Sequence, residues 1–137
     1  MIATTLTPDL IQAEVRRFWA AFLDKRINEI TEFYTPDSTV FTTSSRRAEP
    51  GRLAAARRVR EYFAPHILLR HSMGMIDVQM LADSVAVASY NFDFHAERRV
   101  QSGMPDEHLL GARCTQVFGI DAEGEVKIFH EHLSVGS

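Results

Sequence analysis

The sequence of 137 residues contains a single cysteine, Cys114, and no long apolar run. A lone cysteine cannot close a disulfide within the chain, so nothing in the sequence requires an oxidising compartment. No stretch approaches the roughly 20 apolar residues that a membrane-spanning helix needs. The residues from Met1 to Leu10 lack the basic start and the apolar run of a signal peptide. We therefore expect a cytoplasmic protein with no membrane partner.

An excess of positive charge is also lacking. Fifteen Lys and Arg residues against eighteen Asp and Glu give a formal net charge of −3, so no overall field attracts nucleic acid. Arginines do gather between Arg46 and Arg60, but no aromatic residues alternate with them. We interpret this cluster as a solvated helix face and expect no nucleic-acid partner. Glycine-rich phosphate loops, serine elbows and dinucleotide-binding fingerprints are absent from the sequence, so we expect no cofactor.

The chain does have enough apolar residues, 45% of the total, to form the core of one domain over residues 1–137, with an ordered part from about 8 to 135. The first half is predicted to be helical. Thr7 is a suitable N-cap before Pro8, and apolar residues then recur at spacings of three and four up to Leu23. Two further helices are predicted over 27–34 and 52–64, with a short strand over 38–43 between them.

The second half is predicted to form antiparallel strands. Four segments, over 75–81, 85–95, 109–120 and 126–135, are rich in β-branched and aromatic residues. The sequence from Asp121 to Gly124 predicts a hairpin turn, with a glycine available for a positive φ. Helices followed by an antiparallel series of strands predict an α+β fold.

Two motifs, in this order of elements, resemble a known family. The first is FYTPDSTVF at Phe33–Phe41, and the second is TQVFGIDAEGEVKIFHEHLS at Thr115–Ser134. Both are similar to segments of the SnoaL-like and ketosteroid isomerase-like domains of the nuclear transport factor 2-like superfamily. The C-terminal motif is also similar to the association domain of calcium/calmodulin-dependent protein kinase II. The resemblance implies a cone-like, curved antiparallel sheet wrapped around N-terminal helices, a pocket inside the cone, and a homodimer.

The resemblance also argues against one known chemistry. Steroid isomerases use a tyrosine, an aspartate base and a protonated aspartic acid. The three corresponding positions hold Phe18, Thr42 and Gln116 in this sequence. Phenylalanine cannot donate a hydrogen bond and threonine is no base near neutral pH, although Gln116 can still donate to an oxyanion. We therefore do not expect steroid-type isomerisation.

The last strand carries the candidate catalytic residue. Side chains alternate along a strand, so Phe129, Glu131 and Leu133 share one face and His130 and His132 share the other. The hydrophobic pattern alone favours the histidine face as the inner one, whereas the resemblance places Gln116 and Leu133 in the cavity, and we adopt the second interpretation. A carboxylate among apolar walls is desolvated, which raises its pKa and suits it to acid–base work. The alternative is that Glu131 pairs with an arginine or reaches solvent.

The two histidines on the other face of the last strand are candidate metal ligands. His130 and His132 are spaced to supply two metal ligands, but no third ligand is marked by spacing, so we expect an outer polar network and no metal. The residues predicted to line the pocket are Trp19, Phe22, Tyr34, Phe41, Tyr62, Phe63, Asn91, Gln116, Phe118, Phe129 and Leu133.

These observations predict a protein that binds a small apolar or mixed-polarity ligand in a pocket. They leave open whether it is an enzyme. Any chemistry would be that of a cofactor-independent isomerase, cyclase or dehydratase, with Glu131 as the proton shuttle. The alternative is a non-catalytic ligand-binding or oligomeric assembly module that resembles the kinase association domain.

Overall fold

The computed structural model describes residues 5–63, 66–98 and 107–135. Helix α1 begins where the sequence predicts, because the Thr7 hydroxyl accepts a hydrogen bond from the Leu10 amide at 3.2 Å and Pro8 occupies the first turn. The face of α1 that carries Ile11, Val15 and Phe18 is buried. The helices are α1 (Pro8–Leu23), α2 (Ile27–Glu32), α3 (Gly51–Arg58) and the π-helical turn η1 (Val59–Phe63).

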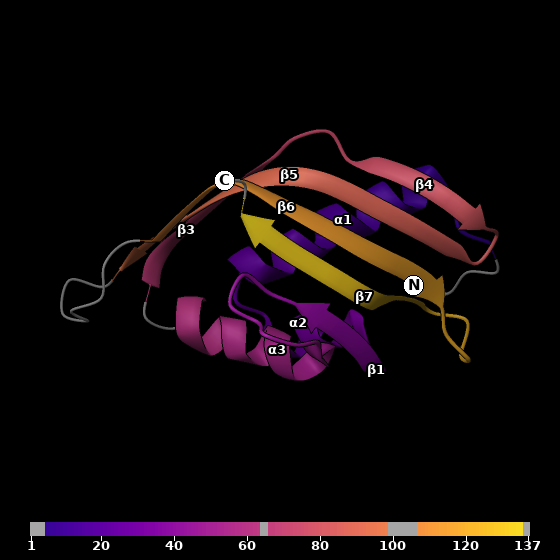
Figure 1. Ribbon diagram of the computed structural model, residues 1–137, viewed down its shortest axis with the longest axis horizontal. Helices are drawn as coiled ribbons and strands as arrows, with labels where there is room; N and C mark the ends of the chain where they lie inside the picture. Colours follow the sequence, from indigo (N-terminus) through magenta and orange to yellow (C-terminus); the bar gives the residue numbers. More distant parts are fainter. Residues whose placement is uncertain (1–4, 64–65, 99–106, 136–137) are drawn as a thin grey trace.

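One curved sheet arches over the helices (Figure 1), in the strand order β2-β1-β7-β6-β5-β3, with β4 paired to β5. Strands β1 and β7 are parallel and the other pairs are antiparallel, so the sheet is mixed. The predicted α+β fold, with a curved sheet around N-terminal helices, is confirmed. The strands are β1 (Tyr34–Phe41), β2 (Glu49–Pro50), β3 (His66–Met73), β4 (Asp77–Ala82), β5 (Val85–Arg98), β6 (Glu107–Ile120) and β7 (Val126–Val135).

Several boundaries differ from the prediction. The chain leaves α2 before Tyr34, because Tyr34 already pairs with Ile128 of β7. Pro36 falls where the β1–β7 register shifts, which is where a strand tolerates a proline. Strands β2 and β3 were not predicted. The Asp121–Gly124 turn is confirmed, since the Gly124 amide donates to the Asp121 carbonyl at 3.0 Å and Gly124 has a φ of 80°.

A β-bulge in β7 sets the direction of the site residues. Val117 of β6 pairs with His130, whereas Phe118 pairs with Ile128, so Phe129 is the extra residue. Ile128 is buried before the bulge and Glu131 after it. Phe129 itself is 39% exposed, and its ring covers Gly119 so closely that a Cβ there would lie 2.6 Å from it. The prediction that Phe129 faces the cavity is therefore wrong, because the bulge interrupts simple alternation.

The core lies between the concave side of the sheet and the helices. The ring of Phe18 is at its centre and contacts the rings of Trp19, Phe22, Phe33 and Tyr34 at centroid distances of 4.8–5.9 Å. None of the helices in the described part of the chain is long and apolar enough to cross a membrane.

Candidate functional site

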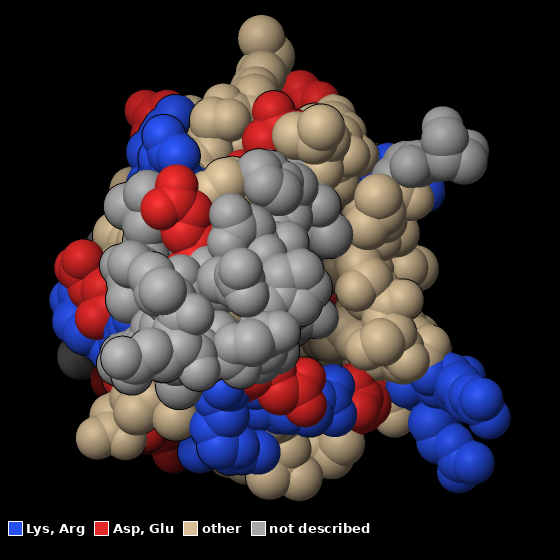
Figure 2. Space-filling view, turned by 90° about the vertical axis from the view of Figure 1, so that its left-hand side faces the viewer, with Lys and Arg blue, Asp and Glu red and all other residues tan. Residues whose placement is uncertain are grey.

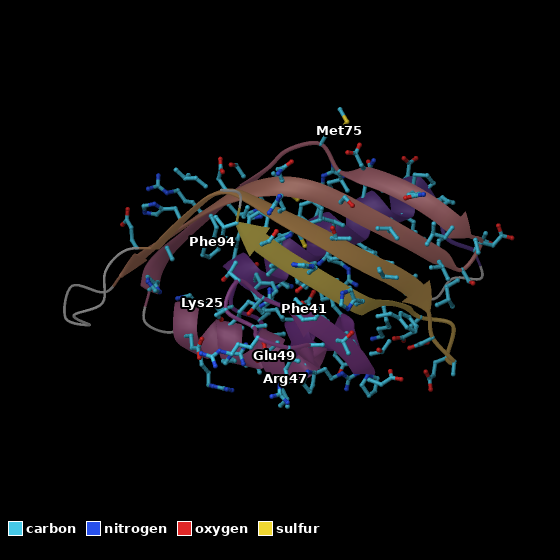
Figure 3. The ribbon with its side chains drawn as sticks, in the orientation of Figure 1. Lys25, Phe41, Arg47, Glu49, Met75 and Phe94 are labelled. Atoms are coloured by element: carbon cyan, nitrogen blue, oxygen red, sulfur yellow. The ribbon has the colours of Figure 1, made fainter. Side chains whose placement is uncertain are left out.

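A partly open cavity of about 60 Å³ lies between α1, α3 and the inner face of the sheet. It has an apolar wall from α1 and the sheet, and a polar side formed by the residues after β1 and by α3. Figure 3 shows Phe94 on the concave side of the sheet, which is the side of this cavity. The lining residues are Trp19, Phe22, Thr42, Thr43, Ser44, Arg57, Arg58, Glu61, Phe92, Phe94, Ala112, Leu133 and Ser134.

A second, more open cavity of about 640 Å³ shares Phe94 with the first. It lies at the β3 edge of the sheet and includes His71. Ligand pockets usually measure about 300–1,000 Å³, so the inner cavity is small for a ligand pocket and the outer cavity falls within the usual range.

Behind the apolar wall, four buried side chains form a chain of hydrogen bonds. The Trp19 indole donates to the Tyr90 hydroxyl at 2.7 Å. The Tyr90 hydroxyl donates to Gln116 Oε1 at 3.0 Å, and Gln116 Nε2 donates to Glu131 Oε1 at 2.7 Å. Indole nitrogen is a donor only and a carboxylate accepts only, so the hydrogen bonds run from Trp19 towards Glu131. The chain links α1 to β5, β6 and β7, and holds the pocket wall in one arrangement.

Glu131 receives two further donors. Arg58 Nη2 lies 2.7 Å from Glu131 Oε2, and the Tyr34 hydroxyl lies 3.0 and 3.1 Å from the two carboxylate oxygens. Burial raises the pKa of Tyr34 well above its usual value, and the nearby Glu131 carboxylate raises it further, so Tyr34 remains a donor. Burial opposes the charge of Arg58, but Tyr34 and Glu131 raise its pKa, so the guanidinium stays charged. The structure thus pairs Glu131 with an arginine, which is the alternative interpretation of this residue.

The polar rim is fastened to α3 through Glu49. Arg57 donates to both Glu49 oxygens at 2.5 and 2.7 Å, and the Ser45 hydroxyl donates to Glu49 at 2.6 Å. These hydrogen bonds lower the pKa of Glu49 to about 2. Ser45 in turn accepts from the Thr42 amide at 2.9 Å. This arrangement holds the residues that form the rim of the inner cavity.

The arginine cluster has mixed surroundings. At the end of the molecule in Figure 2, Lys and Arg side chains lie along the lower edge with Asp and Glu between them. Arg57 is paired with Glu49, and its Nε lies 3.9 Å from Glu61. Arg58 is buried, although the sequence was interpreted as a solvated face here. It lies on the same face of α3 as the buried Ala55 and Ala54, at spacings of three and four residues.

His71 is a candidate functional residue that the sequence analysis missed. Its ring stacks on Trp19, with a centroid distance of 4.2 Å and an interplanar angle of 16°. Burial lowers the pKa of His71 to about 4, although Asp93 acts in the opposite direction. The imidazole is therefore neutral near pH 7, and its buried Nε2 has no hydrogen-bond partner. No predicted strand contained His71, because β3 was not predicted, so the sequence did not indicate which way its side chain points.

The structure brings some of the predicted residues to the pocket and not others. Trp19, Phe22 and Leu133 line the inner cavity. Tyr34, Gln116 and Phe118 are fully buried and are not among its lining residues. Whether any of them binds a ligand stays a prediction. The side chains of Tyr62 and Phe63 lie outside the part of the chain that the structure describes.

Besides Phe129, two predicted lining residues face away from the cavity. Asn91 is exposed, because the inward positions of β5 are Tyr90 and Phe92. Phe41 pairs with His132 across the parallel strands β1 and β7, and its ring lies 5.6 Å from that of His132. The prediction for Asn91 rests on family position and that for Phe41 on its aromatic character. Both are wrong in direction, because the strand register decides which face each side chain takes.

His130 and His132 lie on the outer face of β7, opposite Glu131. His130 Nδ1 is 2.8 Å from the Thr39 hydroxyl, and His132 is exposed. Among the described residues, no group of three or more His, Cys, Asp or Glu side chains is placed to hold a metal ion. On the inner face, Cys114 is buried, and burial raises the pKa of its thiol well above the usual value.

No protein-family model matches the sequence, and no curated protein matches it. Solved structures do share its fold. A protein from Novosphingobium aromaticivorans, proposed to be a scytalone dehydratase, has a TM-score of 0.77 at 12% identity, over 93% of this chain and 82% of that chain. A protein from Xanthomonas campestris, proposed to be a calcium/calmodulin-dependent protein kinase II association domain, has a TM-score of 0.74 at 18% identity, over 99% and 92% of the two chains.

A third structure of the same fold, from Catenulispora acidiphila, was solved in complex with S-DNPA. Its TM-score is 0.67 at 21% identity, over 91% of this chain and 92% of that chain. The fold is the nuclear transport factor 2-like, or cystatin-like, fold of these structures. The fold that the sequence motifs implied is therefore confirmed, and the activity of the protein is a separate question.

Proposed function

We propose that the protein binds a small organic molecule of mixed polarity in the inner cavity. The observation that carries this proposal is the division of the cavity into an aromatic wall, which includes Trp19 and Phe94, and a polar side, which includes Thr42 and Arg58. Such a division orients a ligand that has an apolar body and one polar end. The complex of the Catenulispora acidiphila protein with S-DNPA supports the idea that this fold accommodates small molecules.

The binding proposal can be tested through Trp19, which is the only tryptophan in the sequence. Mass spectrometry of the native purified protein identifies retained small molecules, and benzyl alcohol serves as a probe with an aromatic body and one hydroxyl. In ¹⁵N-labelled protein we expect the indole N–H signal of Trp19 to shift and saturate on titration with this probe. Leu133→Phe narrows the cavity and should weaken binding at least tenfold, whereas the matched change Leu81→Phe at a 57% exposed position should not. An indole signal that never moves, with no retained molecule, contradicts the proposal.

An acid–base reaction of the isomerase, cyclase or dehydratase type is the finer proposal, and one observation supports it. His71 offers a neutral imidazole whose Nε2 has no hydrogen-bond partner. Glu131 is less suited to take up a proton, because its oxygens already accept bonds from Arg58, Tyr34 and Gln116. We therefore assign the proton acceptor to His71, which lines the outer cavity, and give Glu131 the role of positioning Arg58 beside the inner one.

A β-hydroxy ketone tests this assignment, because loss of water gives a conjugated ketone that absorbs in the ultraviolet. The imidazole takes a proton from the α-carbon, and the imidazolium returns that proton to the hydroxyl, which leaves the β-carbon as water. With 4-hydroxy-4-phenylbutan-2-one, we expect His71→Gln to abolish turnover and Glu131→Gln, which loosens Arg58, to raise KM without abolishing turnover. Full activity of His71→Gln contradicts the assignment. A solution mass above that of a dimer, with no ligand binding, favours the assembly module instead.

A further inference from the structure

Arg58 is a buried cation with unused hydrogen-bond donors beside the cavity. The residue is 9% exposed, and its guanidinium lies 5.3 Å from the centroid of the Phe22 ring, which also lines the cavity. Nη2 donates to Glu131 and Tyr34, while the buried Nε has no hydrogen-bond partner. A guanidinium carries five N–H groups, and leaving a buried donor unpaired is unfavourable. A ligand oxygen that accepts a hydrogen bond from Arg58 would offset the unfavourable free energy of the unpaired donor.

The charge balance around Arg58 limits what kind of oxygen fits. The charge of Arg58 is already matched by the carboxylate of Glu131, which is fully buried. Arg57 is matched by Glu49, and Glu61 adds a negative charge to the lining. A carboxylate or phosphate would therefore add negative charge to a balanced site. A neutral acceptor oxygen takes up the free donors without this penalty.

We propose that Arg58 is the oxygen-binding residue of the cavity, and that the ligand is a small, uncharged carbonyl compound. Its carbonyl oxygen accepts a hydrogen bond from an unused N–H group of Arg58. Its apolar body lies against Trp19 and Phe94. Glu131 and Tyr34 hold the guanidinium in place before the ligand arrives, so little ordering is needed on binding. This inference rests on the proposed function, because it needs a ligand in that cavity.

Two probes of the same shape test the inference. Acetophenone carries a carbonyl oxygen where α-methylstyrene carries a CH₂ group. In ¹⁵N-labelled protein, the indole signal of Trp19 gives the dissociation constant of each probe, and the Arg58 Nε–H signal reports contact with the oxygen. We expect acetophenone to bind about tenfold more tightly or better, because hydrogen bonds to charged groups are among the stronger ones. We also expect only acetophenone to move the Arg58 signal.

Equal dissociation constants with an unmoved Arg58 signal would overturn the inference and leave the proposed function standing. Failure of both probes to bind would overturn the two together. The double variant Arg58→Met/Glu131→Gln removes both charges, so no buried ion is left unpaired. It should bring the ratio of the two constants close to one, and a retained tenfold ratio would count against Arg58. Arg60→Met, at an exposed arginine of the same region, is the matched control and should keep the ratio. If the double variant does not fold, the Arg58 signal in the unaltered protein decides.

Discussion

Glu131 accepts hydrogen bonds from side chains of three different elements: Arg58 of α3, Tyr34 of β1 and Gln116 of β6. A glutamine in its place keeps the shape but leaves the buried Arg58 without a counterion, which typically costs about 3–5 kcal/mol. We expect Glu131→Gln to lower the free energy of unfolding in urea by about this amount. Glu97→Gln is the control, because its pair with the 63% exposed Arg70 is worth at most about 1 kcal/mol. Equal stability of the two variants would contradict the role of Glu131.

The low pKa of His71 predicts a pH dependence of stability. The pKa is about 4 in the folded protein and about 6.5 in an unfolded chain. Between these values the unfolded state binds a proton that the folded state does not, so the free energy of unfolding falls as the pH drops from about 6.5 to 4. We expect the urea midpoint to fall less between pH 7 and pH 4.5 in His71→Gln than in the unaltered protein. Equal falls would show that His71 titrates normally in the fold.

Single residues also show where sequence reasoning about the site reaches its limit. The aromatic residues of α1, Trp19 and Phe22, were predictable because helical spacing fixes the face they share. Arg58 was not, because a buried arginine becomes favourable only once Glu131, distant in the sequence, is known to lie beside it. Asn91 was misplaced because one residue of strand register exchanges the two faces.

At the scale of elements, the direction of the β7 side chains depends on how β7 packs against β6. The bulge at Phe129 turns Glu131 and Leu133 inward, and the Phe129 ring occupies the space above Gly119 of β6. Alternation along a sequence gives no warning of such an extra residue, because a bulge is defined by the partner strand. Strand β3 escaped prediction for a related reason: it is defined by its pairing with β5 and carries the polar residues Arg70 and His71 among its apolar ones.

The packing of Phe129 on Gly119 leads to a prediction about this strand pair. In Gly119→Ala, the new Cβ meets the Phe129 ring at 2.6–3.2 Å, so the ring has to swing towards solvent. We expect a loss of about 1 kcal/mol in thermal or urea unfolding, at the low end for an overpacked site, because the ring is partly exposed. Phe129→Ala should remove most of that loss when it is combined with Gly119→Ala. Strictly additive effects in this double-mutant cycle would contradict the contact.

At the scale of the whole molecule, the fold was predictable because the order of helices and strands is strongly patterned and its motifs resemble a known family. The parallel pairing of β1 with β7 was not, since it joins residues about 90 positions apart and leaves no local pattern. The homodimer stays a prediction, and sedimentation of the purified protein tests it.

The hydrogen-bond chain from Trp19 to Glu131 crosses from the helical layer through three strands, so it ties the molecule together. Tyr90→Phe leaves the Trp19 indole and the Gln116 oxygen without their partner. Each unpaired buried group costs about 1–3 kcal/mol, and we expect a loss of at least 2 kcal/mol in urea unfolding. Thr39→Val removes an exposed hydroxyl bonded to His130 and should cost less than about 0.5 kcal/mol. A Tyr90→Phe variant as stable as this control would show that the chain contributes little.

The rate at which the Cys114 thiol is labelled reports the opening of the strands around it. The thiol is enclosed in β6 between Tyr90 of β5 and Leu133 of β7, and only a thiolate attacks a disulfide reagent. Labelling must therefore wait until the strands part. Because the sequence has one thiol, every labelled molecule has opened at this position. The labelling rate of the unmodified protein therefore measures how often the pocket wall opens. A molecule bound against that wall would lower the labelling rate of Cys114.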